Sequence, residues 1–238
     1  MRKKFLSFAL VFGLFLAGCE LTPYSDTYTQ ETAPEAAHSG LTDLIWDGDP
    51  YVEVNGDVPY FTEEDFEAEA PILTFSPLDA YGRTGEAYGV LSEFTMPRED
   101  EERESLSDVT PSGWNQARYE GIKSGGWLYN RCRLIAWALS GENDNPENLI
   151  TGTRYLNTEG MLPFELETIE YLEENPDDLL LYRATPVYEG DNLLAYGVLL
   201  EAASVDDPED FSFCVYLFNV QPGVLIDYET GESESLEF

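Results

Sequence analysis

Three apolar segments lie close together in the last third of this 238-residue chain, and their spacing limits what the chain can fold into. Residues 179–188 and 193–204 are rich in Leu, Val, Ala and Tyr, and the turn sequence Glu-Gly-Asp-Asn separates them. Such a pair predicts a β-hairpin. Residues 211–220 are typical of a buried strand, and Gln-Pro-Gly then turns the chain into another apolar run at 224–228. We therefore expect a β-rich C-terminal region.

Shorter segments with strand character precede this region. Residues 51–56 alternate between apolar and polar and end in a turn, and residues 86–96 follow a glycine-rich stretch. We expect both in one sheet. Residues 127–132 and 149–156 are two further predicted strands.

Two helices are predicted between these strands and the hairpin. Residues 134–140 predict a short helix that stops at Gly141. A longer helix begins at Asn157 or Thr158, either of which can cap it, and ends before the Asn-Pro pair at 175–176. Its expected apolar stripe consists of Leu162, Leu166, Ile169 and Leu172.

The first 18 residues differ in kind from the rest of the chain. Three basic residues at positions 2–4 precede an apolar run over 5–16, which is short for a membrane span. Leu-Ala-Gly then leads into Cys19, a pattern similar to the lipobox of bacterial lipoproteins. We interpret residues 1–18 as a lipoprotein signal peptide and Cys19 as the lipidation site. An ordinary cleaved signal peptide with an incidental cysteine is the alternative.

Residues 19–44 predict an acidic, flexible tether, because they are rich in Thr, Ser, Pro, Glu and Ala and contain few apolar residues. The only histidine, His38, lies in this tether, where it is expected to be inert. The folded domain is expected over residues 45–238. The protein is then exported and anchored by lipid at the extracellular face of the cell membrane, and we expect a monomer.

The chain is strongly acidic, with 12 Lys and Arg against 47 Asp and Glu. Removal of residues 1–18 removes three basic residues and no acidic ones, which leaves a formal charge of 9 − 47 = −38. This charge favours solubility and opposes tight, non-specific binding of nucleic acid. The acidic stretch at 98–110 predicts a surface loop or short solvated helix, and the acidic end at 229–238 predicts a frayed terminus.

Two cysteines remain besides the lipidation site. Cys132 and Cys214 are compatible with a disulfide, which exported proteins often contain, and equally with two small buried thiols. The sequence leaves both interpretations open.

Seven phrases occur in order between Phe75 and about Gly231: FSPLDAYGRTGEAYG, PSGW, YNRCRLIAW, LSGEN, NLITGTRYLNTEGMLPFE, LYRATPVYEGDNLLAYGV and FNVQPGVLIDYETG. Together they resemble the DNA/RNA non-specific endonuclease family, in particular the exported DNA-entry nuclease type of Gram-positive bacteria. The resemblance implies an α+β fold with a ββα-metal nuclease core on an antiparallel sheet and two principal helices. It also implies DNA or RNA as the substrate and Mg²⁺ or Mn²⁺ as the cofactor.

Phosphodiester hydrolysis needs a base for water, a divalent cation for the developing charge, and cationic groups for the phosphate. By resemblance, Asn157 matches the residue that holds Mg²⁺, and Glu165 matches the carboxylate that orients metal-bound water. Taken singly, Asn157 could be a helix cap and Glu165 a charge on a helix face. Their occurrence in the family's order favours the functional interpretation.

The resemblance also assigns residues around the metal. Arg131 and Arg83 match arginines near the phosphate, and Asn130 and Asn148 match supporting asparagines, although Asn148 could equally be a turn residue.

Arg133 stands where the family motif has its histidine general base. A guanidinium stays protonated and cannot accept a proton from water, and its charge repels a nearby cation. Asn115 occupies a position where related sequences often have another histidine, so no nearby histidine takes over. We therefore expect weak metal binding and low hydrolytic activity.

Two functions follow. The first is a membrane-tethered, Mg²⁺-dependent endonuclease without sequence preference, with activity reduced by Arg133. The alternative is a catalytically inactive nuclease-fold lipoprotein that binds a polyanion or a protein partner. Its positive groove would be formed by Arg83, Arg131, Arg133 and Arg154.

Overall fold

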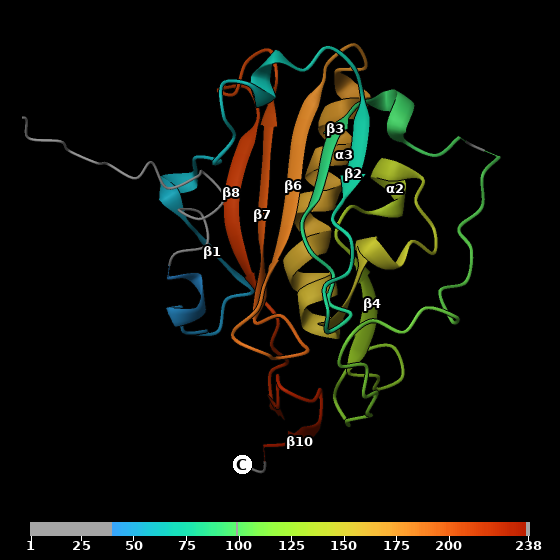
Figure 1. Cartoon of the computed structure of the whole chain (residues 1–238), viewed down its shortest axis with the longest axis vertical. Coiled ribbons are helices and arrows are strands. Elements are labelled where there is room, and N and C mark those ends of the chain that lie inside the picture. The colour runs from blue at the N-terminus through green and yellow to red at the C-terminus, as the bar shows by residue number, and fades with distance from the viewer. Residues whose placement is uncertain (1–39, 99, 237–238) are drawn as a thin grey trace, which may run out of the picture. The chain divides into compact units, whose positions relative to one another are not determined.

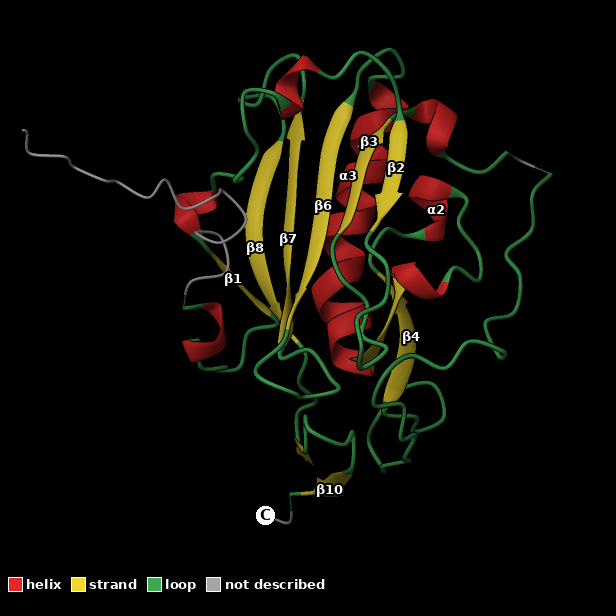
Figure 2. Ribbon diagram, in the orientation of Figure 1, coloured by secondary structure: helices red, strands yellow, loops and turns green. Residues whose placement is uncertain are grey.

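The computed structural model describes residues 40–98 and 100–236. The predicted signal peptide, Cys19 and His38 lie outside the described residues. None of the helices within the described residues has the length and apolar character that a bilayer crossing requires. A six-stranded antiparallel sheet organises the fold, and α3 (Leu162–Glu174) packs against one of its faces (Figures 1 and 2).

The strands of the main sheet are β1 (Tyr51–Glu53), β2 (Ile72–Phe75), β3 (Ala87–Leu91), β6 (Leu180–Val187), β7 (Gly197–Ser204) and β8 (Ser212–Phe218). Their order across the sheet is β1-β8-β7-β6-β3-β2. β6 and β7 form the predicted hairpin, with Leu180 opposite Ser204 and Val187 opposite Gly197. Every residue of these two strands is buried, which explains why both sequences are mostly apolar.

Two features of the main sheet differ from the sequence prediction. The strand predicted over 86–96 ends at Leu91, because the Ser92 hydroxyl accepts a hydrogen bond from the Phe94 N–H at 3.1 Å and begins a 3₁₀ turn over residues 93–95. β2 was not predicted. It is a four-residue edge strand, too short to give a periodic signal.

A second, smaller sheet precedes the long helix. β4 (Tyr129–Arg133) and β5 (Leu149–Thr153) pair antiparallel, with Arg133 opposite Leu149. A π-helical segment (Leu156–Met161) then leads into α3. Two antiparallel strands followed by a helix form the predicted ββα unit, so the predicted α+β fold is confirmed. The first predicted helix is only one turn, α2 (Trp137–Ser140), and ends where Gly141 has a left-handed φ of 68°.

The long helix begins earlier than predicted and buries a different face. Thr153, not Asn157 or Thr158, caps it, because its Oγ1 accepts a hydrogen bond from the Leu156 N–H at 2.9 Å. The residues on its buried face are Met161, Phe164, Thr168 and Leu172. Leu162 and Leu166 were expected in the stripe but are 41% and 55% exposed. Both sets of residues repeat at three- or four-residue spacing, so the helix has two such rows, and Leu162 and Leu166 belong to the row that lines a cavity and not the core.

The ends of the described chain are better packed than the sequence suggests. Leu41 is buried in a cluster with Tyr216 and Phe218, so packing begins four residues before the expected domain start at residue 45. The acidic end was expected to be frayed, but β10 (Ser233–Ser235) pairs with β9 (Val224–Ile226). Backbone pairing there outweighs the repulsion among exposed carboxylates.

The two cysteines left open by the sequence are both free and buried. Cys132 packs in the cluster between the main sheet and α3, whereas Cys214 packs in the cluster on the other side of the sheet. They therefore serve as small core residues, and the disulfide alternative is wrong.

Candidate active site

Two adjoining cavities lie where β4, the start of the long helix and the loop after residue 100 meet. The larger has a volume of about 560 Å³ and is lined by Arg103, Leu106, Trp114, Gln116, Trp127, Tyr129, Asn130, Arg131, Arg154 and Asn157. The smaller has a volume of about 220 Å³. The smaller is lined by Arg103, Arg131, Arg133, Ala136, Trp137, Ala138, Asn157, Leu162, Glu165, Leu166 and Ile169. Because Arg103, Arg131 and Asn157 line both, the two cavities are adjacent, and we treat them as one site.

Asn157 stands where the two cavities meet. It lies in the π-helical segment that follows β5 and lines both cavities. Glu165 lies two turns further along the helix and lines the smaller cavity. Burial raises the pKa of Glu165 to about 7, although the charges of Arg103 and Arg133 lower it. The predicted metal ligand and the predicted water-orienting carboxylate therefore face the same cavity.

Arg133, the last residue of β4, is only 4% exposed. Its Nε donates to the carbonyls of Glu142 at 3.0 Å and Asn143 at 3.2 Å, and its Nη2 donates to Asn143 at 2.9 Å. Its Nη1 is buried without a partner among the described residues. Burial and the charge of Arg103 lower the pKa of Arg133, Glu165 raises it, and the net pKa is about 10. The side chain is thus a buried cation held by neutral carbonyl groups.

Asn130 and Arg131 precede Arg133 on β4 and line the larger cavity. Arg131 donates to the carbonyls of Val109 and Ser107, and its guanidinium carbon lies 4.2 Å from the ring centre of Trp114. The Asn130 amide nitrogen is buried and has no hydrogen-bond partner in the described part of the chain. The predicted phosphate arginine is therefore rigidly placed beside an unused donor.

Asn148 supports the site from outside the cavities. It is 1% exposed, and its side chain donates to the Ile135 carbonyl and accepts from the Ile135 N–H, both at 2.9 Å. It thereby fixes the backbone that follows Arg133.

Arg83 lines neither of these cavities. It forms an ion pair with Asp79 at 2.7 Å and donates to the Gly190 carbonyl at 2.8 Å. Its guanidinium carbon lies 4.9 Å from the Tyr81 ring centre and 4.7 Å from that of Tyr188. These contacts explain Arg83 as a residue that fixes the loop between β6 and β7.

Several lining residues were not identified as site residues from the sequence. Arg103 belongs to the acidic stretch that was interpreted as a solvated loop, and Trp114 and Trp127 had no assigned role. Asn115 lines neither cavity. No local pattern marks these residues, because they meet only after the loops fold over β4.

The electrostatic character of the site is opposite to that of the chain. The chain has 12 Lys and Arg, and three of them precede residue 40, which leaves 12 − 3 = 9 in the described residues. Four of these nine line the two cavities: Arg103, Arg131, Arg133 and Arg154. Glu165 is the only carboxylate in either lining. The site is therefore a positive region on an acidic protein, suited to an anion.

The donors in the site fit a hard divalent cation that keeps most of its water. Asn157 and Glu165 supply oxygen atoms, which Mg²⁺ prefers. No cluster of three or more His, Cys, Asp or Glu that could hold a metal occurs within residues 40–98 and 100–236. A cation bound there would rely on Asn157, Glu165 and water.

The sequence model for the DNA/RNA non-specific endonuclease family matches residues 67–206, which is more than half of the chain. The chain belongs to this family. A deoxyribonuclease from Streptococcus dysgalactiae subsp. equisimilis is 29% identical over 197 residues, covering 67% of this chain. This chain spans only 59% of the length of that relative.

Solved structures agree with this assignment. Sda1 nuclease with a bound zinc ion is 31% identical, with a TM-score of 0.60 over 69% of this chain and 81% of that one. NucA from Streptococcus agalactiae with a magnesium ion bound has a TM-score of 0.66 at 24% identity, covering 77% of this chain and 85% of that one. The second similarity supports the fold alone.

Proposed function

We propose that this member of the family is an exported, lipid-anchored protein that binds the phosphodiester backbone of DNA or RNA and hydrolyses it slowly. One observation carries the proposal: Arg103, Arg131, Arg133 and Arg154 line two adjoining cavities that Asn157 and Glu165 also line. Clustered guanidinium groups are suited to phosphate because they form paired, charge-assisted hydrogen bonds.

Slow hydrolysis follows from the chemistry of Arg133. With a pKa of about 10, its protonated form exceeds the neutral form by about a thousandfold at pH 7. It therefore cannot serve as the general base, a role that typically contributes about 10² to 10⁴ in rate. Its buried Nη1, which has no partner in the described residues, instead suits it to donate a hydrogen bond to a phosphate oxygen.

A divalent cation, Mg²⁺ or Mn²⁺, supports the reaction in this proposal. Asn157 would bind it directly, and Glu165 would orient its water. The cation would neutralise charge that develops on the phosphate and leaving oxygen. Arg133 and Arg103 face the same cavity and oppose cation binding, so we expect weak affinity. Related structures contain magnesium or zinc, which supports a divalent metal without specifying which one.

A second candidate function is binding without hydrolysis, with a polyanion or a protein partner in the same groove. It is favoured by the way Arg133 is held. Three hydrogen bonds to the Glu142 and Asn143 carbonyls give this side chain a structural role in the loop, which a histidine could not fill in the same way.

The lipid anchor rests on Cys19 and the signal sequence before it. Metabolic labelling with a fatty acid should mark the wild-type protein, and Cys19→Ser should abolish the label. A wild-type protein that is secreted without lipid contradicts the anchor.

The hydrolytic proposal is tested by nicking of supercoiled plasmid with Mg²⁺, Mn²⁺ or EDTA. We expect slow, EDTA-sensitive nicking by the wild type and an increase of at least about 10²-fold for Arg133→His, because a neutral imidazole can accept a proton at pH 7. Arg133→Gln is the matched control, since it removes the charge without supplying a base.

Each outcome separates the two candidates. Equal small changes for histidine and glutamine, with wild-type binding of DNA retained, support binding without hydrolysis. A wild type that already cuts rapidly, and that Arg133→His does not improve, contradicts our account of Arg133.

A further inference from the structure

We propose that the larger cavity is a subsite for an unpaired nucleobase, stacked on Trp127, which makes single-stranded DNA or RNA the preferred ligand. This inference rests on the proposed function, and it adds which form of nucleic acid the site selects.

Trp127 is the central observation. Its side chain is 44% exposed at the edge of the cavity, although the next residues, Leu128 and Tyr129, are buried. A large aromatic ring left exposed beside a cavity is a common feature of binding sites. An indole face can stack on any base, so it suits a ligand without a defined sequence.

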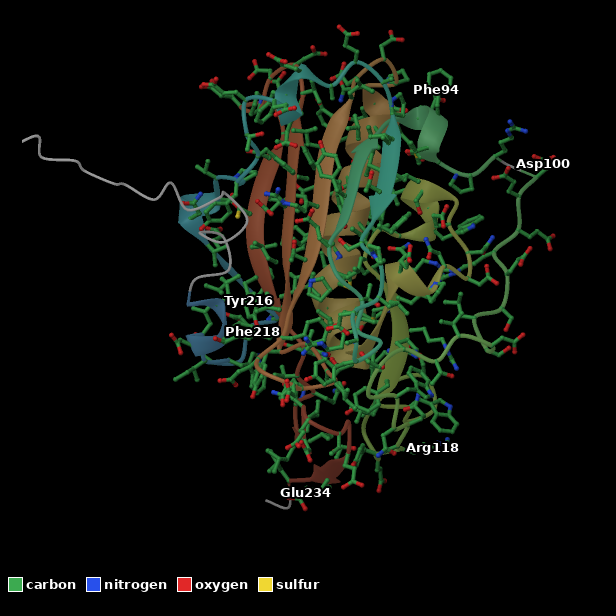
Figure 3. The ribbon with its side chains drawn as sticks, viewed as in Figure 1. Phe94, Asp100, Arg118, Tyr216, Phe218 and Glu234 are labelled. Atoms are coloured by element: carbon green, nitrogen blue, oxygen red, sulfur yellow. The ribbon has the colours of Figure 1, made fainter. Side chains whose placement is uncertain are left out.

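The indole is held in place before any ligand arrives. Arg118 lies with its guanidinium carbon 4.7 Å from the Trp127 ring centre and is itself fixed by hydrogen bonds from Nε and Nη2 to the Gly125 carbonyl. The backbones of Arg118 and Trp127 also form a β-bridge. Arg118, visible in the loops that lead into β4 (Figure 3), lines a separate hollow with Gly125. Arg118 itself does not line the larger cavity, so its contact with the ring does not place a guanidinium in that cavity.

The rest of the lining complements a nucleotide. The Trp114 ring supports Arg131: the Arg131 guanidinium carbon lies 4.2 Å from the centre of the Trp114 ring. The centres of the Trp114 and Tyr129 rings are 6.5 Å apart. Two buried donors in the lining, Asn130 Nδ2 and Arg154 Nε, have no hydrogen-bond partner among the described residues. Unused donors of this kind match the oxygen and nitrogen acceptors of a base or phosphate.

The position of the cavity explains the preference for single strands. It shares Arg103, Arg131 and Asn157 with the smaller cavity, so a phosphate at Asn157 would have its neighbouring base beside Trp127. In a duplex that base is paired and stacked, and presenting it to Trp127 would require unstacking. An unpaired strand has no such requirement.

The test is fluorescence anisotropy of a labelled oligothymidylate and of its duplex with oligoadenylate, both in EDTA to prevent cleavage. We expect the wild type to bind the single strand at least about fivefold more tightly than the duplex. Trp127→Ala should weaken single-strand binding about five- to tenfold without changing duplex binding, and Trp127→Phe should retain most of it. Phe94→Ala is the matched control, because Phe94 is 86% exposed and lines neither cavity.

Failure of this inference is distinguishable from failure of the proposed function. If the wild type binds both forms equally and Trp127→Ala changes neither, the nucleobase subsite is wrong while backbone binding stands. If Trp127→Ala weakens both forms to the same degree, stacking is not the cause and the inference is also overturned. If the wild type binds neither form, the proposed function itself fails. A melting curve for each variant establishes that it is folded.

Discussion

Two buried arginines lie on opposite sides of the main sheet, and they are held in different ways. Arg183 on β6 is 6% exposed and forms two hydrogen bonds with the fully buried Glu201, at 2.8 and 3.0 Å. Arg133 on β4 is 4% exposed, but among the described residues it has only carbonyl partners and one Nη1 without any. The two arginines are therefore similarly buried, but only Arg183 is paired with a carboxylate.

The pKa directions follow from this difference. Burial lowers the pKa of Arg183, but the hydrogen bonds and charge of Glu201 outweigh burial, so its pKa is raised. At Arg133 burial dominates and the pKa falls to about 10. Removing one partner of a buried ion pair destabilises the fold strongly, because the other charge stays buried. A buried cation without a carboxylate partner instead has its charge available to a ligand. This contrast is why we place function at Arg133 and not at Arg183.

The largest expected effect comes from breaking the compensated pair. Arg183→Met should lower the free energy of unfolding by about 3–5 kcal/mol, because Glu201 would remain charged and fully buried without its partner. Urea denaturation measures this directly. The double variant Arg183→Met, Glu201→Gln should recover most of the loss. Equal losses in the single and double variants would show that packing of Arg183 against Phe61, 4.8 Å from its guanidinium carbon, matters more than charge.

An intermediate, pH-dependent effect is expected at Glu165, the carboxylate whose charge raises the pKa of Arg133. Its folded-state pKa is raised from 4.5 to about 7, so its ionisation opposes folding. Below pH 4.5 the group is neutral in both states and costs nothing. Between pH 4.5 and 7 only the folded state keeps the proton, so stability falls as pH rises, and above pH 7 the full cost remains.

Glu165→Gln should therefore unfold with a free energy higher than the wild type by roughly 1–3 kcal/mol at pH 8, after a reduction for its partial exposure. The difference should vanish near pH 4. Denaturation curves across this range check it. Glu170→Gln, an exposed position on the same helix, is the control and should show no such trend. A constant difference at every pH would mean that ionisation of Glu165 is not the cause.

The smallest effect is expected at the uncompensated arginine itself. Arg133→Met should lower the free energy of unfolding by about 1 kcal/mol or less, because only hydrogen bonds to the Glu142 and Asn143 carbonyls are lost and no buried carboxylate loses its pair. It is the matched counterpart of Arg183→Met in the same urea series. A loss as large as that of Arg183→Met would mean that Arg133 is chiefly a structural residue, and it would weaken the proposed role in phosphate binding.

Much of the fold could be predicted because it is encoded in local patterns. The hairpin of β6 and β7 follows from two apolar runs around a four-residue turn, and the end of α3 follows from its Asn-Pro boundary. The apolar stripe of α3 could not be predicted in full. Two rows of residues run along this helix at the same spacing, and only the packing shows that Leu162 and Leu166 line the smaller cavity instead of the core.

Some residues of the candidate site could likewise be predicted from the sequence, and others could not. Arg131, Arg133, Asn157 and Glu165 were identified from the order of the family phrases, and all four line the site. Arg83 was identified with them, yet Asp79 and two tyrosines hold it elsewhere. Arg103 and Trp127 were not identified, because an arginine in an acidic loop and a tryptophan before a strand have ordinary explanations.

The sequence by itself determined the family, the order of the ββα unit and the presence of an arginine at position 133, since each depends on residue identity along the chain. A guanidinium cannot accept a proton from water whatever surrounds it near neutral pH. Only the tertiary structure decided which arginines meet, which of them are compensated by a carboxylate, and which aromatic ring stays exposed beside them. Those outcomes depend on packing between segments distant in sequence, where burial and the nearest charge set the state of each side chain.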